Sequence, residues 1–221
     1  MDTSQLGAVL LYLPVFLFSV IVHECSHGLV ALWRGDPTAK YAGRLTLNPV
    51  PHIDLYGSII LPGILLLTGS RFLIGWAKPV PVDARNFRGK LDGILVAAAG
   101  PTSNVLLGFV FAVLYIVSFM VSAPVREPMG VIATEGLRLN CLLAIFNLLP
   151  IPPLDGHWVA LRVLPPTLAH AYARIGFMGI IVIFLLLMIP AVNYTLVQAP
   201  TIFLATLLLR LAALPFGVAT S

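Results

Sequence analysis

The pentapeptide His23-Glu24-Cys25-Ser26-His27 holds the residues of this chain that are best suited to chemistry. Two histidines four positions apart project from one face of a helix, about one turn from each other. That spacing allows two imidazoles to bind one zinc ion, and Glu24 beside them is a candidate general base. If the segment is helical, the pentapeptide therefore predicts a catalytic zinc site.

The chain around the pentapeptide is apolar from about Leu6 to Trp33, which is long enough to cross a bilayer as a helix. Ionisable residues inside a membrane span are costly and usually mark a function. The alternative is that His23 and His27 are polar residues satisfied by neighbouring helices. Burying two histidines and a glutamate together in a membrane costs too much free energy for a purely structural role, so the sequence favours a metal site.

Composition indicates an integral membrane protein. Of the 221 residues, 59% are hydrophobic and only 10% are charged, which is far from the surface of a soluble domain. The net charge of +4 comes from few residues, so it concerns membrane topology and predicts no nucleic-acid partner. Two cysteines give no disulfide framework.

The distribution of charge predicts an orientation in the cell membrane. Residues 1–5 carry no basic residue, unlike a signal peptide, so we expect the first helix to be retained. The first positive charges, Arg34, Lys40 and Arg44, follow that helix. The positive-inside rule then places the N-terminus outside and the metal-binding face toward the cytoplasm.

Residues 36–90 predict an interruption of the helical pattern. The stretches 43–50 and 78–82 predict short extended segments, because prolines disfavour helix and β-branched residues suit strands. Between them lies an apolar segment, 56–75, broken at Pro62-Gly63. A full crossing would put the basic residues after it outside, so we favour a re-entrant hairpin, with a crossing as the alternative.

Further apolar segments complete an all-α polytopic fold of about five to six transmembrane helices. They span about 94–121, 131–149, 175–192 and 201–214. We expect one membrane domain over 1–221, with a catalytic core at about 6–164 and supporting helices at about 172–215.

Two polar residues on these segments have both a structural and a functional interpretation. Asn104 follows the small residues of the second span, and it could form an interhelical hydrogen bond or donate to a peptide carbonyl or oxyanion. Asp155 follows a proline-rich break. Two histidines and a carboxylate form a catalytic zinc ligand set, so Asp155 is the candidate third ligand; alternatively it is the N-cap of a helix near Trp158. His52 and Asp54 lack partners at ligand spacing and predict a polar interfacial loop.

Three motifs in order resemble the site-2 protease family of intramembrane zinc metalloproteases. They are the His-Glu-x-x-His pentapeptide at 23–27, Ala-Gly-Pro-Thr-Ser-Asn at 99–104 and Asn-Leu-Leu-Pro-Ile-Pro-Pro-Leu-Asp-Gly at 147–156. The resemblance implies one zinc ion per chain, held by His23, His27 and Asp155, with Glu24 as the catalytic base. It also implies that Asn104 and Asn147 hold the substrate or stabilise the oxyanion.

The resemblance further implies that the substrates are transmembrane segments of membrane proteins. In the family, a membrane-associated β region like the stretches 43–50 and 78–82 presents an edge to the substrate. The chain resembles a short form without the PDZ and CBS domains of many relatives. Two other classes remain as alternatives, a zinc transporter and a non-catalytic scaffold that binds membrane proteins. Glu24 favours the protease, because a transporter needs ligands but no base beside them.

Overall fold

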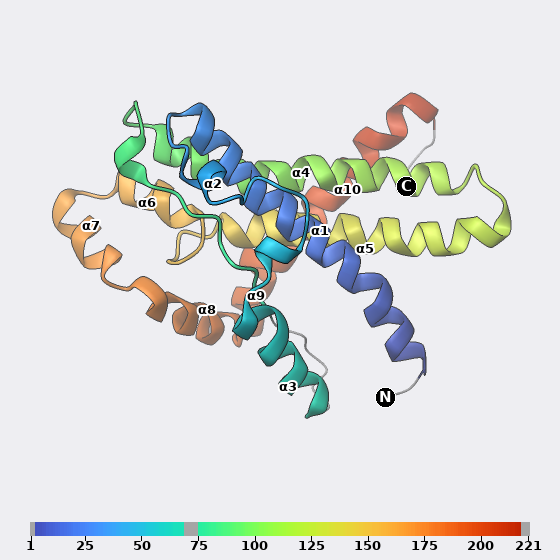
Figure 1. Ribbon diagram of the computed structural model, residues 1–221. Helices are drawn as coiled ribbons and strands as arrows, with labels where there is room; N and C mark the ends of the chain where they lie inside the picture. Colours follow the sequence, from blue (N-terminus) through green and yellow to red (C-terminus); the bar gives the residue numbers. More distant parts are fainter. Residues whose placement is uncertain (1–2, 69–74, 218–221) are drawn as a thin grey trace. The chain divides into compact units, whose positions relative to one another are not determined.

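The computed structural model describes residues 3–68 and 75–217, which are mostly helical and include no β-strand (Figure 1). The chain forms two compact units, Met1–Asp92 and Gly93–Ser221. The first unit contains the predicted His-Glu-x-x-His helix, and the second contains the predicted carboxylate.

Helix α1, Thr3–Trp33, dominates the first unit and confirms the predicted first helix. Its 31 residues would extend about 46 Å, more than a bilayer core needs. Short elements follow it, namely α2 (Thr38–Tyr41), η1 (Val50–His52), η2 (Leu55–Ile60), α3 (Leu61–Leu67) and η3 (Ala84–Asn86).

The stretches 43–50 and 78–82 were expected to form a β region, and neither is a strand in the described part of the chain. The second stretch is nonetheless extended and anchored by its backbone. Trp76 N–H donates to the Gly57 carbonyl over 3.2 Å and Lys78 N–H donates to the His52 carbonyl over 2.9 Å. Pro79 and Pro81 lack N–H groups, so a continuous hydrogen-bond ladder cannot form along this segment.

The helical run Leu55–Leu67 overlaps the predicted re-entrant segment, 56–75. A helix of this length extends about 20 Å, which is less than the roughly 30 Å of a hydrocarbon core. Its length suits a re-entrant hairpin better than a straight crossing. Residues 69–74 of the predicted segment lie outside the described residues.

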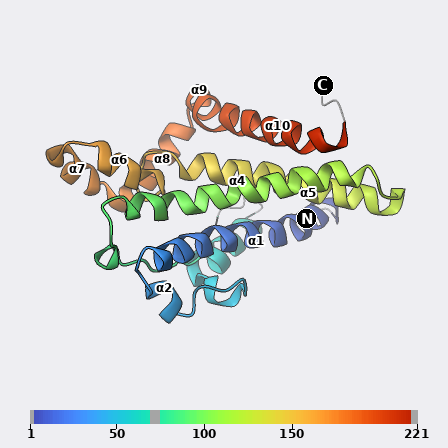
Figure 2. The same cartoon turned by 90° about the horizontal axis from the view of Figure 1, so that it is seen from above.

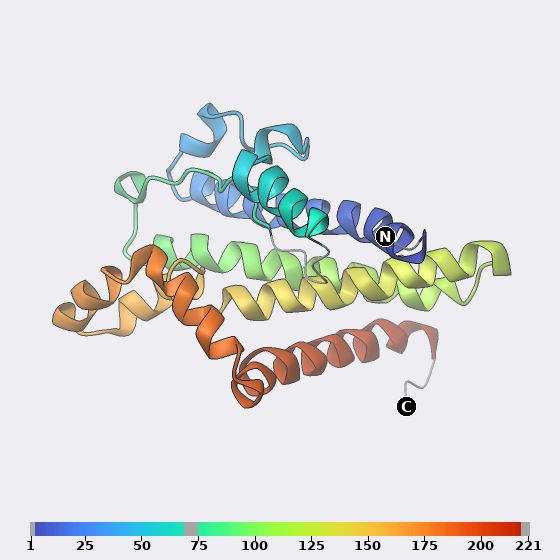
Figure 3. The same cartoon turned by 90° about the horizontal axis from the view of Figure 1, so that it is seen from below.

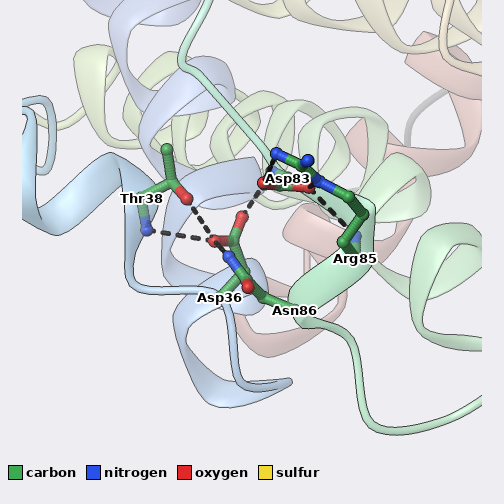
Figure 4. Close-up of polar contacts among 5 residues, drawn as sticks. All are labelled: Asp36, Thr38, Asp83, Arg85 and Asn86. Atoms are coloured by element: carbon green, nitrogen blue, oxygen red, sulfur yellow. Dashed lines mark hydrogen bonds and ion pairs between the residues drawn. The ribbon is translucent and has the colours of Figure 1, made fainter.

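Asp36 ties the end of α1 to the chain around η3 (Figure 4). Its buried carboxylate accepts hydrogen bonds from the Thr38 N–H and hydroxyl, from the Asn86 amide and from the Asp83 N–H. Arg34 adds an ion pair to buried Asp92 with a 2.6 Å separation. Because residues 83–92 are fastened in this way, the extended segment before them returns toward α1.

Two long antiparallel helices form the second unit's framework, α4 (Asp92–Ser118) and α5 (Ala123–Asn147) (Figure 2). The Phe111 ring lies against Gly136, where an added methyl group would overlap the ring. Buried Asn104 on α4 donates to the Asn140 side chain on α5 over 2.9 Å. A small residue and an interhelical amide bond therefore hold this pair together.

The remaining helices of the second unit follow the proline turn after α5. They are α6 (Gly156–Val163), α7 (Pro166–Ala173), η4 (Gly176–Met178), α8 (Gly179–Leu187), α9 (Pro190–Asn193), η5 (Tyr194–Gln198), α10 (Ala199–Ala213) and η6 (Leu214–Phe216). Helix α10 runs along α5 (Figure 3), and its Leu208 approaches Gly108 of α4.

Four helices of the described residues are long and apolar enough to cross a membrane, fewer than the five to six expected. They cover Tyr12–Trp33, Asp92–Ser118, Ala123–Asn147 and Pro190–Phe216. The expected span 175–192 differs, because the structure divides it into η4, α8 and the start of α9. The nine residues of α8 extend only about 14 Å, too short to cross.

Candidate metal centre

His23 and His27 lie one turn apart on α1, as their spacing predicts. Both are buried, and their Nε2 atoms face each other at 3.0 Å. Two imidazole nitrogens on one tetrahedral zinc ion would lie about 3.3 Å apart, given Zn–N bonds of about 2.0–2.1 Å. The pair thus presents two nitrogens at nearly chelating separation, and their chemistry fits zinc.

Glu24 is held by a backbone donor from the extended segment. The Val80 N–H donates to its Oε2 over 2.8 Å. Gly28, one turn further along α1, makes room for this approach, because a Cβ there would lie only 2.9 Å from Val80 Cγ1 and 2.6 Å from Leu45 Cδ2. The helix face that carries Glu24 therefore packs closely against the segment that supplies the donor.

Cys25 and His52 have structural partners in the first unit. The Cys25 thiol donates to the Thr46 carbonyl over 3.1 Å, and His52 Nε2 lies 2.9 Å from the same oxygen. The Asp54 carboxylate accepts from the N–H groups of Tyr56 and Gly57 and so caps η2. These contacts agree with the polar-loop role predicted for His52 and Asp54.

Asp155 lies in the second unit at the N-cap position of α6, and its side chain makes no capping hydrogen bond there. Gly156 explains how the turn is built, because an added methyl group would overlap the Leu148 carbonyl oxygen near the end of α5. Tyr172 on α7 donates to the Pro150 carbonyl over 2.7 Å and fixes the same turn. The half-buried carboxylate is therefore carried by a tightly packed turn.

Asn104 and Asn147 are placed differently within the second unit. Asn104 is completely buried and bonded to Asn140, which is the interhelical role among its two interpretations. Asn147 is the last residue of α5 and is half-buried, and its amide donates to the Leu143 carbonyl over 3.0 Å. Contact of either residue with a substrate stays a prediction.

Sequence reasoning missed two hydrogen-bond partners of these polar groups, the Val80 N–H that donates to Glu24 and the Asn140 side-chain oxygen that accepts from Asn104. The Val80 group that bonds Glu24 is a backbone N–H, so a pattern of side-chain types cannot reveal it. A signal was present in the alternation Pro79-Val80-Pro81, because two residues without N–H groups isolate a single donor between them. Asn140 was visible as a polar residue in an apolar segment, but only the packing of α4 on α5 pairs it with Asn104.

Relatives of this chain are named as zinc metalloproteases. The Bacillus subtilis protein "Putative zinc metalloprotease YwhC" is 36% identical over 191 residues, covering 84% of each chain. The Rip2 protein of Mycolicibacterium smegmatis, named likewise, is 29% identical over 86% of this chain and 71% of its own. MJ0611 of Methanocaldococcus jannaschii, again so named, is 42% identical over 67 residues, or 29% of this chain and 31% of its own.

The chain belongs to the family of zinc metalloproteases that YwhC represents. This membership supports a metalloprotease function and implies zinc, in agreement with the histidine pair on α1. No family model matches the chain, and no solved structure does.

Proposed function

We propose that this protein is an intramembrane zinc endopeptidase of the site-2 protease type. The observation that carries the proposal is the His-Glu-x-x-His pentapeptide inside an apolar helix long enough to cross a bilayer, with the two histidine Nε2 atoms 3.0 Å apart. A soluble metalloprotease has no need to place this motif within such a helix. The three ordered motifs and the family membership support the same assignment.

In this proposal His23, His27 and Asp155 would hold one zinc ion, which would supply an activated water for the attack. The ion would lower the pKa of that water toward about 7 and polarise the scissile carbonyl. Glu24 accepts the proton of the attacking water and returns it to the leaving amine. Because Oε2 already accepts from the Val80 N–H, we assign the proton exchange to Oε1.

The proposed substrates are transmembrane helices of other membrane proteins. Such a helix hides its peptide bonds within its own hydrogen-bond ladder, so it must unwind locally before hydrolysis. Asn104 and Asn147 are the proposed substrate or oxyanion contacts, and the extended segment around 78–82 is the proposed docking edge. We place the site toward the cytoplasm and the N-terminus outside, on the basis of the basic residues after α1.

The test compares the wild type with Glu24→Gln in detergent, using a model transmembrane helix with a helix-breaking pair as substrate and measuring bound zinc. We expect the wild type to cleave and the variant to keep its zinc while losing at least about a hundredfold of the rate. If both bind zinc and neither cleaves any of several substrates, a transporter or scaffold is the better description. A wild type that binds no zinc overturns the metal site.

A further inference from the structure

We propose that the backbone N–H of Val80 is a positioning group for Glu24, resting on the proposed function of Glu24 as general base. The N–H donates to Oε2 over 2.8 Å from a segment 56 residues away in sequence. The Glu24 carboxylate is only partly buried, so this donor limits its rotation where surrounding atoms do not.

The local sequence leaves Val80 as the sole backbone donor at this point. Pro79 and Pro81 have no N–H, and the next donors on either side are those of Lys78 and Val82. The Lys78 N–H is already used by the His52 carbonyl. Within Pro79–Pro81, the one backbone N–H that can bond Glu24 is therefore that of Val80.

That peptide group is held from both ends. Its N–H bonds Glu24, while its carbonyl oxygen, which belongs to Pro79, accepts from Arg44 Nη2 over 3.3 Å. The same guanidinium nitrogen donates to the Lys78 carbonyl over 2.5 Å, and Arg44 is buried. The buried Arg44 guanidinium donates to two successive carbonyls, which fixes the plane of the Pro79–Val80 peptide group. The direction of the Val80 N–H is fixed with it.

Side-chain packing sets the distance between the segment around Val80 and helix α1. Val80 is buried, and its Cγ1 would lie 2.9 Å from a Cβ on Gly28, one helical turn beyond Glu24. Only a glycine at position 28 lets the segment come this close to α1. Hydrogen bonding, peptide orientation and close packing thus converge on one arrangement of the carboxylate.

This arrangement matters for catalysis because it restricts rotation about the terminal torsion of the Glu24 side chain. The final torsion of a glutamate is broad, so an unheld carboxylate samples many orientations. With Oε2 fixed, Oε1 is presented in one direction toward the proton it must accept. Loss of the donor would leave zinc ligands unchanged and lower the fraction of Glu24 that is correctly oriented.

The sharpest test replaces the Val80 peptide nitrogen with an ester oxygen, by incorporating the α-hydroxy analogue of valine into the full-length chain. This change deletes the N–H and keeps the side chain. We expect kcat to fall by about tenfold to a hundredfold, with KM and bound zinc unchanged. The matched control is the same ester replacement at Lys78, two residues earlier, which deletes the N–H that donates to the His52 carbonyl.

Two conventional substitutions at Val80 test the same N–H independently through their effect on kcat. Val80→Ala keeps the N–H and loses side-chain volume, whereas Val80→Pro loses the N–H, so kcat should be lower for the proline variant. Isotope-edited infrared spectroscopy of the Glu24 carboxylate, assigned by its loss in Glu24→Gln, supplies a readout that needs no cleavage. We expect its band to shift with the Val80 ester and to stay in place with the Lys78 ester.

Two results would overturn the positioning role. One is an unchanged Glu24 infrared band in the Val80 ester, whether or not the protein cleaves substrate. The other is an equal loss of kcat in the two ester variants, which would show that the segment matters only structurally. Failure of the proposed function is recognised separately, by a wild type that is no more active than Glu24→Gln.

Discussion

At His23 and His27 the helix itself creates the chelating pair, because residues four positions apart stack on one face. Their Nε2 atoms lie 3.0 Å apart. The other two candidate ligands of the same turn have partners elsewhere, since Glu24 accepts from the Val80 N–H and Cys25 donates to the Thr46 carbonyl. In the proposed site a carboxylate from a distant segment would complete the ligand set, and Asp155 is the residue that the motifs indicate.

The proposed role of Asp155 predicts a loss of metal in Asp155→Asn. An amide is a neutral and weaker zinc ligand than a carboxylate, so zinc affinity should fall by at least about a hundredfold. Metal content after dialysis against a graded series of chelator concentrations measures the change. Asp83→Asn is the control, because Asp83 pairs with exposed Arg85, and it should retain zinc. Equal zinc retention in both variants would exclude Asp155 as a ligand.

At the scale of elements, Asp36 decides how the extended segment meets α1. Burial alone would raise the pKa of Asp36, but hydrogen bonds from Thr38, Asn86 and Asp83 outweigh that effect and lower it from 3.8. A depressed pKa in the folded state means that the charged carboxylate stabilises the fold. This contribution is fully present above pH 3.8 and is lost as the pH falls through the folded value.

Acid should therefore loosen the junction between α1 and residues 83–86. We expect protection from amide hydrogen exchange, corrected for the intrinsic rate, to fall there below about pH 3.8. Asp36→Asn should lose roughly 1–3 kcal/mol at neutral pH, because the buried amide has one acceptor oxygen in place of two, and should remove most of the acid dependence. The pKa of Asp83, about 2, is held down by Arg85; that exposed pair contributes little. An acid transition that survives in Asp36→Asn would assign it to another group.

The turn before α6 gives a prediction that depends on backbone packing. A methyl group in Gly156→Ala would overlap the Leu148 carbonyl, and a backbone atom cannot rotate away as a side chain does. We expect a loss of about 1–3 kcal/mol together with weaker zinc binding, because Asp155 moves with the turn. Gly130→Ala on α5, where the nearest atom is 3.7 Å away, should change neither. Thermal unfolding and zinc content, measured on both variants, test this.

The elements that the sequence predicts well are those set by local periodicity. Helix α1 and its histidine pair follow from an apolar run and a four-residue spacing. The expected β region fails for a local reason too, since Pro79 and Pro81 remove ladder donors. By contrast, the Asp83–Asp36 and Val80–Glu24 hydrogen bonds join residues 47 and 56 positions apart. The sequence shows that Asp36 and Glu24 can accept hydrogen bonds, but it does not show which distant backbone N–H donates to each.

At the scale of the whole molecule, one membrane topology must be consistent both with the four apolar helices and with the distribution of the few charged residues. Helix α4 places its two ends on opposite sides of the bilayer if it spans. Basic residues concentrate before it, at Arg85, Arg88 and Lys90, and only Arg126 lies shortly after it. The positive-inside rule therefore predicts that Lys90 lies in the cytoplasm and Ser122 outside, and the same rule predicts that the Glu24 end of α1 lies near the cytoplasm.

Single cysteines at these two positions test that topology. In cells whose protein has Cys25 and Cys141 replaced by serine or alanine, a membrane-impermeant maleimide should label Ser122→Cys from outside. Lys90→Cys should react only after the membrane is permeabilised. Both positions are exposed, so reagent access within the protein is not the limiting factor. Reversed labelling would place the proposed active site toward the exterior, and labelling of both in intact cells would show that α4 does not separate two compartments. The expected pattern puts the water that Glu24 must deprotonate on the cytoplasmic side.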